Sequence, residues 1–280
     1  IASLLKASGA LNLKGAVTAT GGAAVVLEAQ QVDAVSPGNR WGSSLAINTT
    51  GAVNLSAGKD GELFRDLKLG ALSVGGGNSR IDAGLIELTA LTSLTGGTLV
   101  LDASSGAVFV LPGADLTGKL TPANRQIAFT QDVVTQAAGS RIEVADGAQL
   151  QVVASKGGSV ALLTSDVGAV PTAANVFNGG LSVRAGGKAD GPTPWDANKV
   201  TDAKGVAGLE YSLQNRVRIS GSQVTIGSAG IEADVVSIKA DSVKTPGAVQ
   251  IVARLPYDNL VGTTSSLPGL TFELTPASFL

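Results

Sequence analysis

Three residue types are missing from the sequence: cysteine, methionine and histidine. Without cysteine the chain has no disulfide bond and no thiol nucleophile, and without histidine it has no Ser-His-Asp triad. The usual zinc ligands are absent with them. These absences predict that stability comes from backbone hydrogen bonds and an aliphatic core, and they fit an exported bacterial protein.

Aromatic and charged residues are scarce, at 4% and 15% of the sequence, whereas 44% is hydrophobic. The core must therefore consist of valine, leucine, isoleucine and alanine. The 20 basic and 22 acidic residues leave a net charge of −2, which provides no basic surface for nucleic acid or an anionic membrane. Glycine and polar residues interrupt the long uncharged runs, so we expect no membrane insertion. The first residues, Ile1–Lys6, lack the features of a signal peptide, and we expect a mature or excised piece.

Glycine, in contrast, is abundant, with 37 residues, and it heads a phrase that recurs along the chain. Each phrase is a glycine, one or two small or polar residues and then alternating aliphatic residues, which predicts a turn followed by a half-buried strand. The copies begin at Gly9, Gly51, Gly70, Gly106, Gly157, Gly179 and Gly247, and similar strands follow Gly96 and Gly147.

The spacing of the phrases predicts stacked coils. Gly51 and Gly70 are 19 residues apart and Gly157 and Gly179 are 22 apart, whereas other gaps are about twice as long. No segment has the helical period, so two or three short strands per coil predict an all-β chain, a parallel β-helix or β-solenoid of about a dozen coils.

Two segments interrupt the phrases and define the expected organisation. A polar stretch with two prolines, residues 186–208, predicts one loop protruding from a β-helix that spans residues 1–254. Residues 255–280 form an irregular C-terminal arm with a possible strand at Leu270–Leu274, which either caps the last coil or contacts a neighbouring molecule.

The phrases in residues 9–252, and more particularly the segment from Gln223 to Pro276, resemble the haemagglutinin repeats of filamentous haemagglutinin-like exoproteins of Gram-negative two-partner secretion. The resemblance implies a right-handed parallel β-helix, an extracellular or cell-surface location, and adhesive or structural work. The Asn-rich secretion domain of that family is missing from the sequence.

Because parallel β-helices also carry enzymes that act on acidic polysaccharides, we considered charged residues on the last strands as a catalytic group. Stacked coils could bring several of them together, or they could form solvated ion-pair ladders on an outward face. The ladder interpretation is favoured, so no catalytic residue is predicted. The candidates are Arg216, Arg218, Glu232, Asp234, Lys239 and Asp241.

Metal and phosphate sites are not expected either. The phrases 58–61 and 190–196 contain oxygen ligands but do not match a calcium repeat, and no helix with a phosphate-binding lysine follows Gly75–Gly77. We therefore predict no cofactor.

Five aromatic residues are candidates for contacts with a partner: Trp195 in the predicted loop, Trp41, and Tyr257, Phe272 and Phe279 in the C-terminal arm. Trp41 and Trp195 could each stack on a sugar, or could instead cover a coil end or a loop base.

The leading hypothesis is a non-enzymatic extracellular rod that associates with itself head to tail. The alternatives are an adhesin that binds cell-surface or extracellular glycans through the 186–208 loop, and a polysaccharide lyase or hydrolase.

Overall fold

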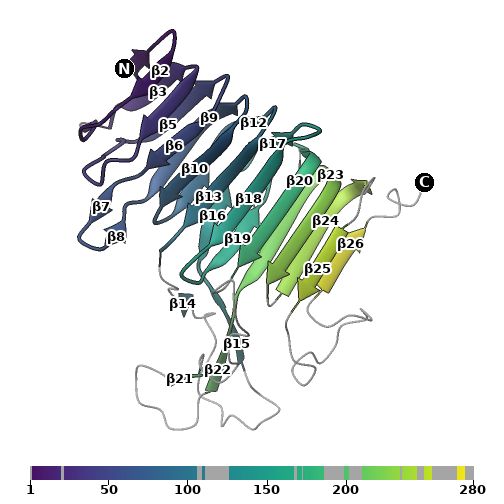
Figure 1. Ribbon diagram of the computed structural model, residues 1–280. Helices are drawn as coiled ribbons and strands as arrows, with labels where there is room; N and C mark the ends of the chain where they lie inside the picture. Colours follow the sequence, from purple (N-terminus) through teal and green to yellow (C-terminus); the bar gives the residue numbers. More distant parts are fainter. Residues whose placement is uncertain are drawn as a thin grey trace.

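The chain folds as a stack of short strands (Figure 1). The computed structural model describes residues 2–19, 22–105, 109–110, 126–166, 169–171, 173–185, 199–201, 210–233, 235–244, 249–253 and 270–274. These residues form strands, turns and bends but no helix, which confirms the all-β class. Twenty strands belong to one sheet, in which every strand pair is parallel.

Paired residues are separated by about one expected coil. Ala2 pairs with Ala24, which pairs with Ser44, and Asn78 pairs with Thr98. These separations of 20 to 22 residues mean that each passage of the chain, here called a rung, lies directly on the previous one. The stacked rungs are compatible with a β-solenoid.

Each rung contributes strands to three columns, in the chain order column 1, column 2, column 3. Column 1 contains β11 (Ile86–Leu88), β16 (Asp132–Gln136), β19 (Ser159–Leu162), the first parts of β23 (Arg216–Ala233) and β24 (Val235–Lys244), and β26 (Leu270–Leu274). Column 2 contains β12 (Thr92–Leu94), β17 (Ile142–Val144), the first part of β20 (Asn175–Ala185), the middle of β23 and the end of β24.

Column 3 is the longest column, with nine strands among the described residues, which at about 4.8 Å per strand span roughly 40 Å. It contains β2 (Ala10–Asn12), β4 (Gln31–Ala34), β6 (Val53–Ser56), β10 (Asn78–Ala83), β13 (Thr98–Ala103), β18 (Gln149–Ala154), the ends of β20 and β23, and β25 (Val249–Ala253). Four early strands run across columns 1 and 2: β1 (Ala2–Lys6), β3 (Ala24–Ala29), β5 (Ser44–Thr49) and β9 (Leu67–Val74).

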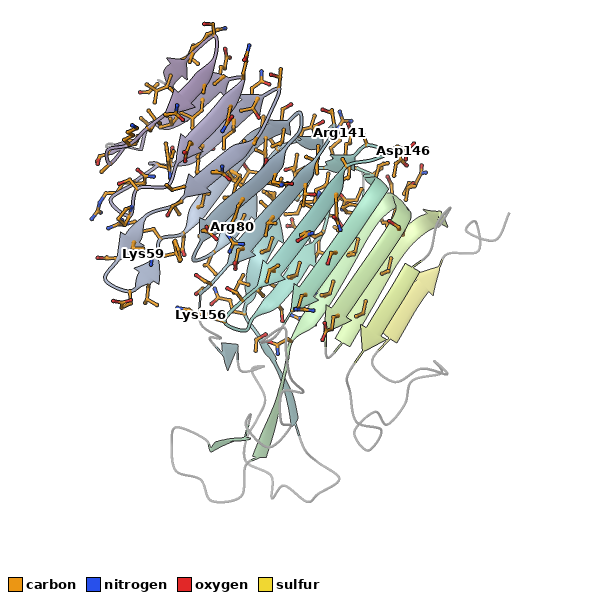
Figure 2. All side chains as sticks on the ribbon, viewed as in Figure 1. Lys59, Arg80, Arg141, Asp146 and Lys156 are labelled. Atoms are coloured by element: carbon orange, nitrogen blue, oxygen red, sulfur yellow. The ribbon has the colours of Figure 1, made fainter. Side chains whose placement is uncertain are left out.

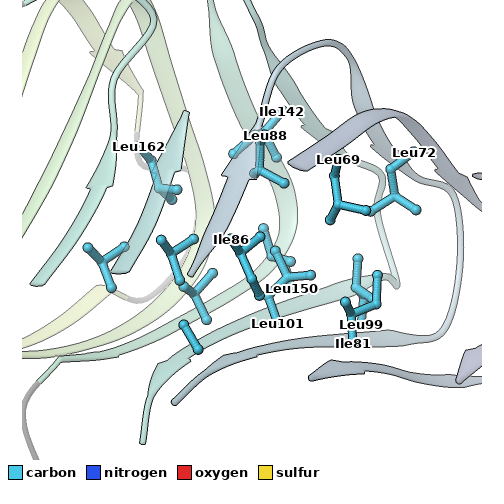
Figure 3. Packing of buried hydrophobic residues seen from close by; sticks show 14 of the residues in the cluster. Leu69, Leu72, Ile81, Ile86, Leu88, Leu99, Leu101, Ile142, Leu150 and Leu162 are labelled. Atoms are coloured by element: carbon cyan, nitrogen blue, oxygen red, sulfur yellow. The ribbon is translucent and has the colours of Figure 1, made fainter. Parts of the chain in front are cut away.

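Alternation along the strands produces the core. In β13 the residues at even steps, such as Leu99 and Leu101, are buried, while those between them are partly exposed. Figure 3 shows Leu69 and Leu72 of one face pointing toward Ile81 and Leu99 of the opposite face. Each fully buried leucine or isoleucine stabilises the fold by about 1.5–3 kcal/mol. Two aromatic rings, Trp41 and Phe177, are buried in the same core, which the sequence predicted to be purely aliphatic.

A buried amide network fills the corner between columns 1 and 2. The Asn175 side chain is completely buried, and its Nδ2 donates to Gln136 Oε1 and Ser220 O, both at 3.0 Å, and to Leu162 O at 3.4 Å. Its Oδ1 accepts from Gln136 Nε2 and from the amide of Ile142, both at 3.0 Å. One side chain thus satisfies backbone groups of three successive rungs where the strands end and the ladder is interrupted.

Three expectations about the organisation were wrong. The phrase after Gly106 is not a strand of the stack, because its described part, β14 (Phe109–Val110), pairs antiparallel with β15 (Gln126–Thr130) outside it. More than one segment leaves the stack, because β7 (Lys59–Asp60) and β8 (Leu63–Phe64) also form a hairpin outside it. The rungs are therefore fewer than a dozen, since these excursions consume residues that were assigned to coils.

The C-terminal arm contributes to the stack. Leu270–Leu274 forms β26, which pairs parallel with Val236–Ala240 of β24 and continues column 1. This part of the arm therefore packs on the last rung of its own chain. The other residues of the expected arm lie outside the described residues.

Candidate functional site

Three excursions that contain described strands leave the stack at one corner, where column 3 ends and column 1 of the next rung begins. They run from β6 to β9, from β13 to β16 and from β20 to β23. In Figure 1 the described strands of these excursions, β7, β8, β14, β15, β21 and β22, lie on the same side of the stack, the lower side in this view. We call this corner the loop-bearing edge.

The chain does not need long connections at this corner. Between β10 and β11 only Gly84 and Leu85 close it, and Ser155–Gly158 close it between β18 and β19. Gly84 fits closely, because a Cβ there would lie 2.5 Å from the carbonyl oxygen of Phe64 on the rung below. The excursions are therefore additions to the fold rather than requirements of it.

The first excursion is the β7–β8 hairpin. Its Lys59 Nζ lies 4.7 Å from the centre of the Phe64 ring, and its base is fixed by the Lys59 amide, which donates to Pro37 O at 2.6 Å. The Arg65 guanidinium donates to Asn39 O at 3.2 Å. Leu63 at the tip is 59% exposed, so the hairpin presents an apolar side chain and a cation to solvent.

The next two excursions, residues 104–131 and 186–215, meet outside the stack. Strand β15 of the former pairs parallel with β22 (Glu210–Gln214) of the latter, in the register Gln126 with Tyr211 through Phe129 with Gln214. With β14 on one side and β21 (Lys199–Thr201) on the other, they form a separate four-stranded sheet. Of the predicted 186–208 loop, the described residues 199–201 are a strand of this sheet.

Trp41 is not on the surface. It is 5% exposed, belongs to the hydrophobic core, and donates from Nε1 to Ser56 O at 2.9 Å. Of its two possible roles the structure supports the packing role, because an indole buried on both faces cannot stack on a sugar.

The other four aromatic candidates lie outside what the structure describes at the level of side chains. The structure does not describe Trp195, Tyr257 or Phe279. Phe272 belongs to β26, where only its backbone is described. Trp195 nevertheless belongs to the excursion that shares its sheet with residues 104–131.

The described charged candidates of the last strands, Arg216, Arg218 and Glu232, divide between two columns. Arg216 and Arg218 lie in column 1, whereas Glu232, on the same long strand β23, lies in column 3. Arg218 pairs with Asp132 at 2.5 Å and Glu232 pairs with Arg184 at 3.1 Å. Lys239 and Asp241 are placed in β24 by their backbone only, and Asp234 lies outside the described residues.

Burial perturbs one of these groups. Desolvation, together with the neighbouring Arg218 charge, lowers the pKa of Arg216 from its ordinary value, while Asp132 raises it. The pairs Arg218–Asp132 and Arg184–Glu232 cross between rungs, as in a ladder, whereas Arg80–Asp82 and Arg141–Glu143 lie within one rung.

Sequence reasoning missed one charged group on the outer face of column 3. Arg80 donates to Asp82 Oδ1 at 2.8 Å and to Asp102 on the next rung, where Asp82 and Asp102 pair in register. Burial raises the pKa of Asp82, partly opposed by Arg80. The sequence contains a signal for this group: Arg80 and Asp82 are two residues apart, so they share one face of a strand, and Asp102 follows Asp82 by 20 residues, which is one coil.

Four of the labelled charges lie near the two edges of the stack and one lies on its face. Figure 2 shows Lys59 and Lys156 toward the loop-bearing edge, Arg80 on the sheet face between the edges, and Arg141 and Asp146 toward the opposite edge. The described residues contain no group of three or more acidic side chains that could hold a metal ion. Residues 58–61, which were not expected to bind calcium, form β7 and the start of a turn. Residues 190–196 lie outside the described residues.

Comparisons of the chain with family models, with curated proteins and with solved structures gave no match. Within the described part of the chain, no helix has the length and hydrophobicity that crossing a bilayer requires.

Proposed function

We propose that this protein is a non-enzymatic structural and adhesive rod, a right-handed parallel β-helix that works outside a Gram-negative cell or on its surface. The observation that carries the proposal is the loop-bearing edge. Because Gly84 and Leu85 suffice to close the corner, the long excursions there are best explained as surface dedicated to contact.

The composition of the excursions supports a weakly charged partner. Residues 104–131 and 186–215 together carry five basic residues, Lys119, Arg125, Lys188, Lys199 and Lys204, and five acidic residues, Asp115, Asp190, Asp196, Asp202 and Glu210. A balanced surface with one tryptophan and many hydroxyl and amide groups suits extracellular or cell-surface glycans better than nucleic acid or an anionic membrane.

The pairing of the described charges supports a role without catalysis. Arg184 and Arg80 each bind a carboxylate of a neighbouring strand, and Arg218 binds Asp132 across the intervening strand β19. A catalytic acid or base needs a carboxylate or an amine that is available to substrate, and these pairs are instead the ordinary polar decoration of an outward sheet face.

Binding to a glycan array tests the adhesive role. We expect the full chain to bind a subset of glycans and a variant in which 187–208 is replaced by a short Gly/Ser linker to lose that binding, with an unchanged circular dichroism spectrum. Val170→Ser, at the corner between columns 1 and 2, is the control and should bind normally. Binding that survives the replacement would refute the role of the loop.

End-to-end self-association is a second candidate, favoured by the first described rung. Leu5 points toward the core in register with Leu27 but is 36% exposed, and the outward-facing Leu4 is 56% exposed. Among the described residues β1 pairs with β3 alone, so its other edge can accept a parallel strand of another copy. We expect Leu5→Lys to prevent filaments that the unchanged protein forms at high concentration; sedimentation that finds only monomers of the unchanged protein would rule this candidate out.

A further inference from the structure

Residues 104–131 and 186–215 are far apart in sequence, yet their return strands lie side by side. Between them the chain builds β16 to β20, and within the stack β19 separates β16 from β23. Outside the stack no strand separates them, because β15 and β22 pair directly. The two return strands therefore converge over the start of β19.

A buried polar node occupies the point of convergence. Thr130 Oγ1, at the end of β15, lies 2.9 Å from Ser159 Oγ, at the start of β19, and donates to Asn215 Oδ1 at 2.9 Å. Ser159 Oγ accepts from the Arg216 amide at 2.9 Å, and Asn215 Oδ1 accepts from the Gly158 amide at 3.0 Å. All three side chains are buried.

The node is sterically specified as well as hydrogen-bonded. Gly158 has φ +109°, a conformation that side chains rarely adopt, and a Cβ there would lie 2.6 Å from Val133. Only glycine at position 158 can therefore adopt the backbone conformation in which its amide donates to Asn215 Oδ1. Buried hydroxyl and amide groups of this kind are costly when they lose a partner, so each member holds the others in place.

We propose that the contact surface at the loop-bearing edge is composite: β15 forms the platform that positions β21 and β22, and Thr130, Ser159 and Asn215 are the positioning residues. Neither excursion is an independent loop. The strands β21 and β22 require a segment more than 50 residues earlier in the chain, and they open and close with that segment as one unit, separately from the rungs of the stack.

Hydrogen exchange measured by mass spectrometry on the full chain tests this proposal. Thr130→Val keeps the shape of the side chain but removes the hydroxyl. We expect exchange to accelerate by about tenfold or more in both 126–130 and 210–214, as the loss of a buried hydrogen bond predicts, while β3 and β4 exchange as before. Thr92→Val is the matched control, because Thr92 is equally buried and its hydroxyl has no partner among the described residues.

A second measurement removes the platform itself. When residues 109–128 are replaced by a short Gly/Ser linker, we expect trypsin to cleave after Lys199 at least tenfold faster, because β21 and β22 lose the strand on which they are built. Unchanged exchange at 210–214 in the Thr130→Val variant, or unchanged cleavage in the replacement variant, would overturn the composite surface. Neither readout needs a ligand, so this outcome is independent of the adhesive role proposed above.

Discussion

Replacing Asn175 is the most direct test of how the rungs are held in register. Asn175→Ala removes an amide that contacts three rungs and leaves the Ile142 amide, the Ser220 carbonyl and both ends of the Gln136 amide without this partner. A buried polar group without a partner costs about 1–3 kcal/mol, and neighbouring groups relax in part. We therefore expect the free energy of unfolding to fall by about 3–5 kcal/mol.

Urea unfolding followed by circular dichroism measures this loss. Asn178→Ala is the matched control, because Asn178 lies three residues further along the same strand and is exposed, and we expect a change within about 0.5 kcal/mol. Amide exchange should also accelerate at Ile142, whose hydrogen bond is lost. A loss of less than about 1 kcal/mol for Asn175→Ala would show that the corner network does not hold the rungs together.

Three further predictions concern the turns and the charges. Gly97→Ala should destabilise the fold by at least about 1–2 kcal/mol in thermal unfolding, because φ is +72° and the new Cβ would meet a carbonyl oxygen at 2.1 Å, whereas Gly230→Ala, in open space, should be nearly neutral. Asp132→Ala should cost more stability in urea than Glu87→Ala, because the arginine partner of Asp132 is largely buried with it, while the Glu87 pair is exposed. Burial raises the pKa of Asp82 above its ordinary value of 3.8, so protonated Asp82 stabilises the folded protein at low pH. This stabilisation is lost as the pH rises through the higher pKa of the folded protein. Over that range the stability of the Asp82→Asn variant should therefore rise relative to that of the unchanged protein.

Each of these predictions has a contrary result. Equal melting temperatures for the two alanine variants would show that the stacked turns tolerate a side chain. Equal costs of the two carboxylate truncations would show that burial does not strengthen the Asp132 pair. A stability difference between the unchanged protein and the Asp82→Asn variant that does not vary with pH would show that Asp82 is not desolvated.

The class of the fold and many of its strands could be predicted because period two and glycine turns are local signals. Local signals do not determine which sheet a strand joins. The Gly106 phrase has the same alternation as the phrases of the stack, yet β14 pairs outside it, since pairing depends on where the chain travels next.

The site was harder to predict for the same reason. Arg216 and Glu232 belong to one strand of 18 residues that passes through all three columns, and nothing in its alternation marks where it bends. Trp41 is flanked by Arg40 and Gly42, which suggests a surface position, but Asn39 and Ser56 enclose it with the core. Burial of this kind is decided by residues of the next rung.

The two-residue connection at Gly84 and Leu85 has a consequence for engineering. It shows that a rung can end and the next begin with almost no intervening chain, while the neighbouring rungs accept 10 and 28 residues at the same point and keep parallel pairing. The link between Leu85 and Ile86 is therefore a natural insertion port. A foreign peptide placed there would be displayed in line with the native excursions, at a chosen height on a rigid scaffold.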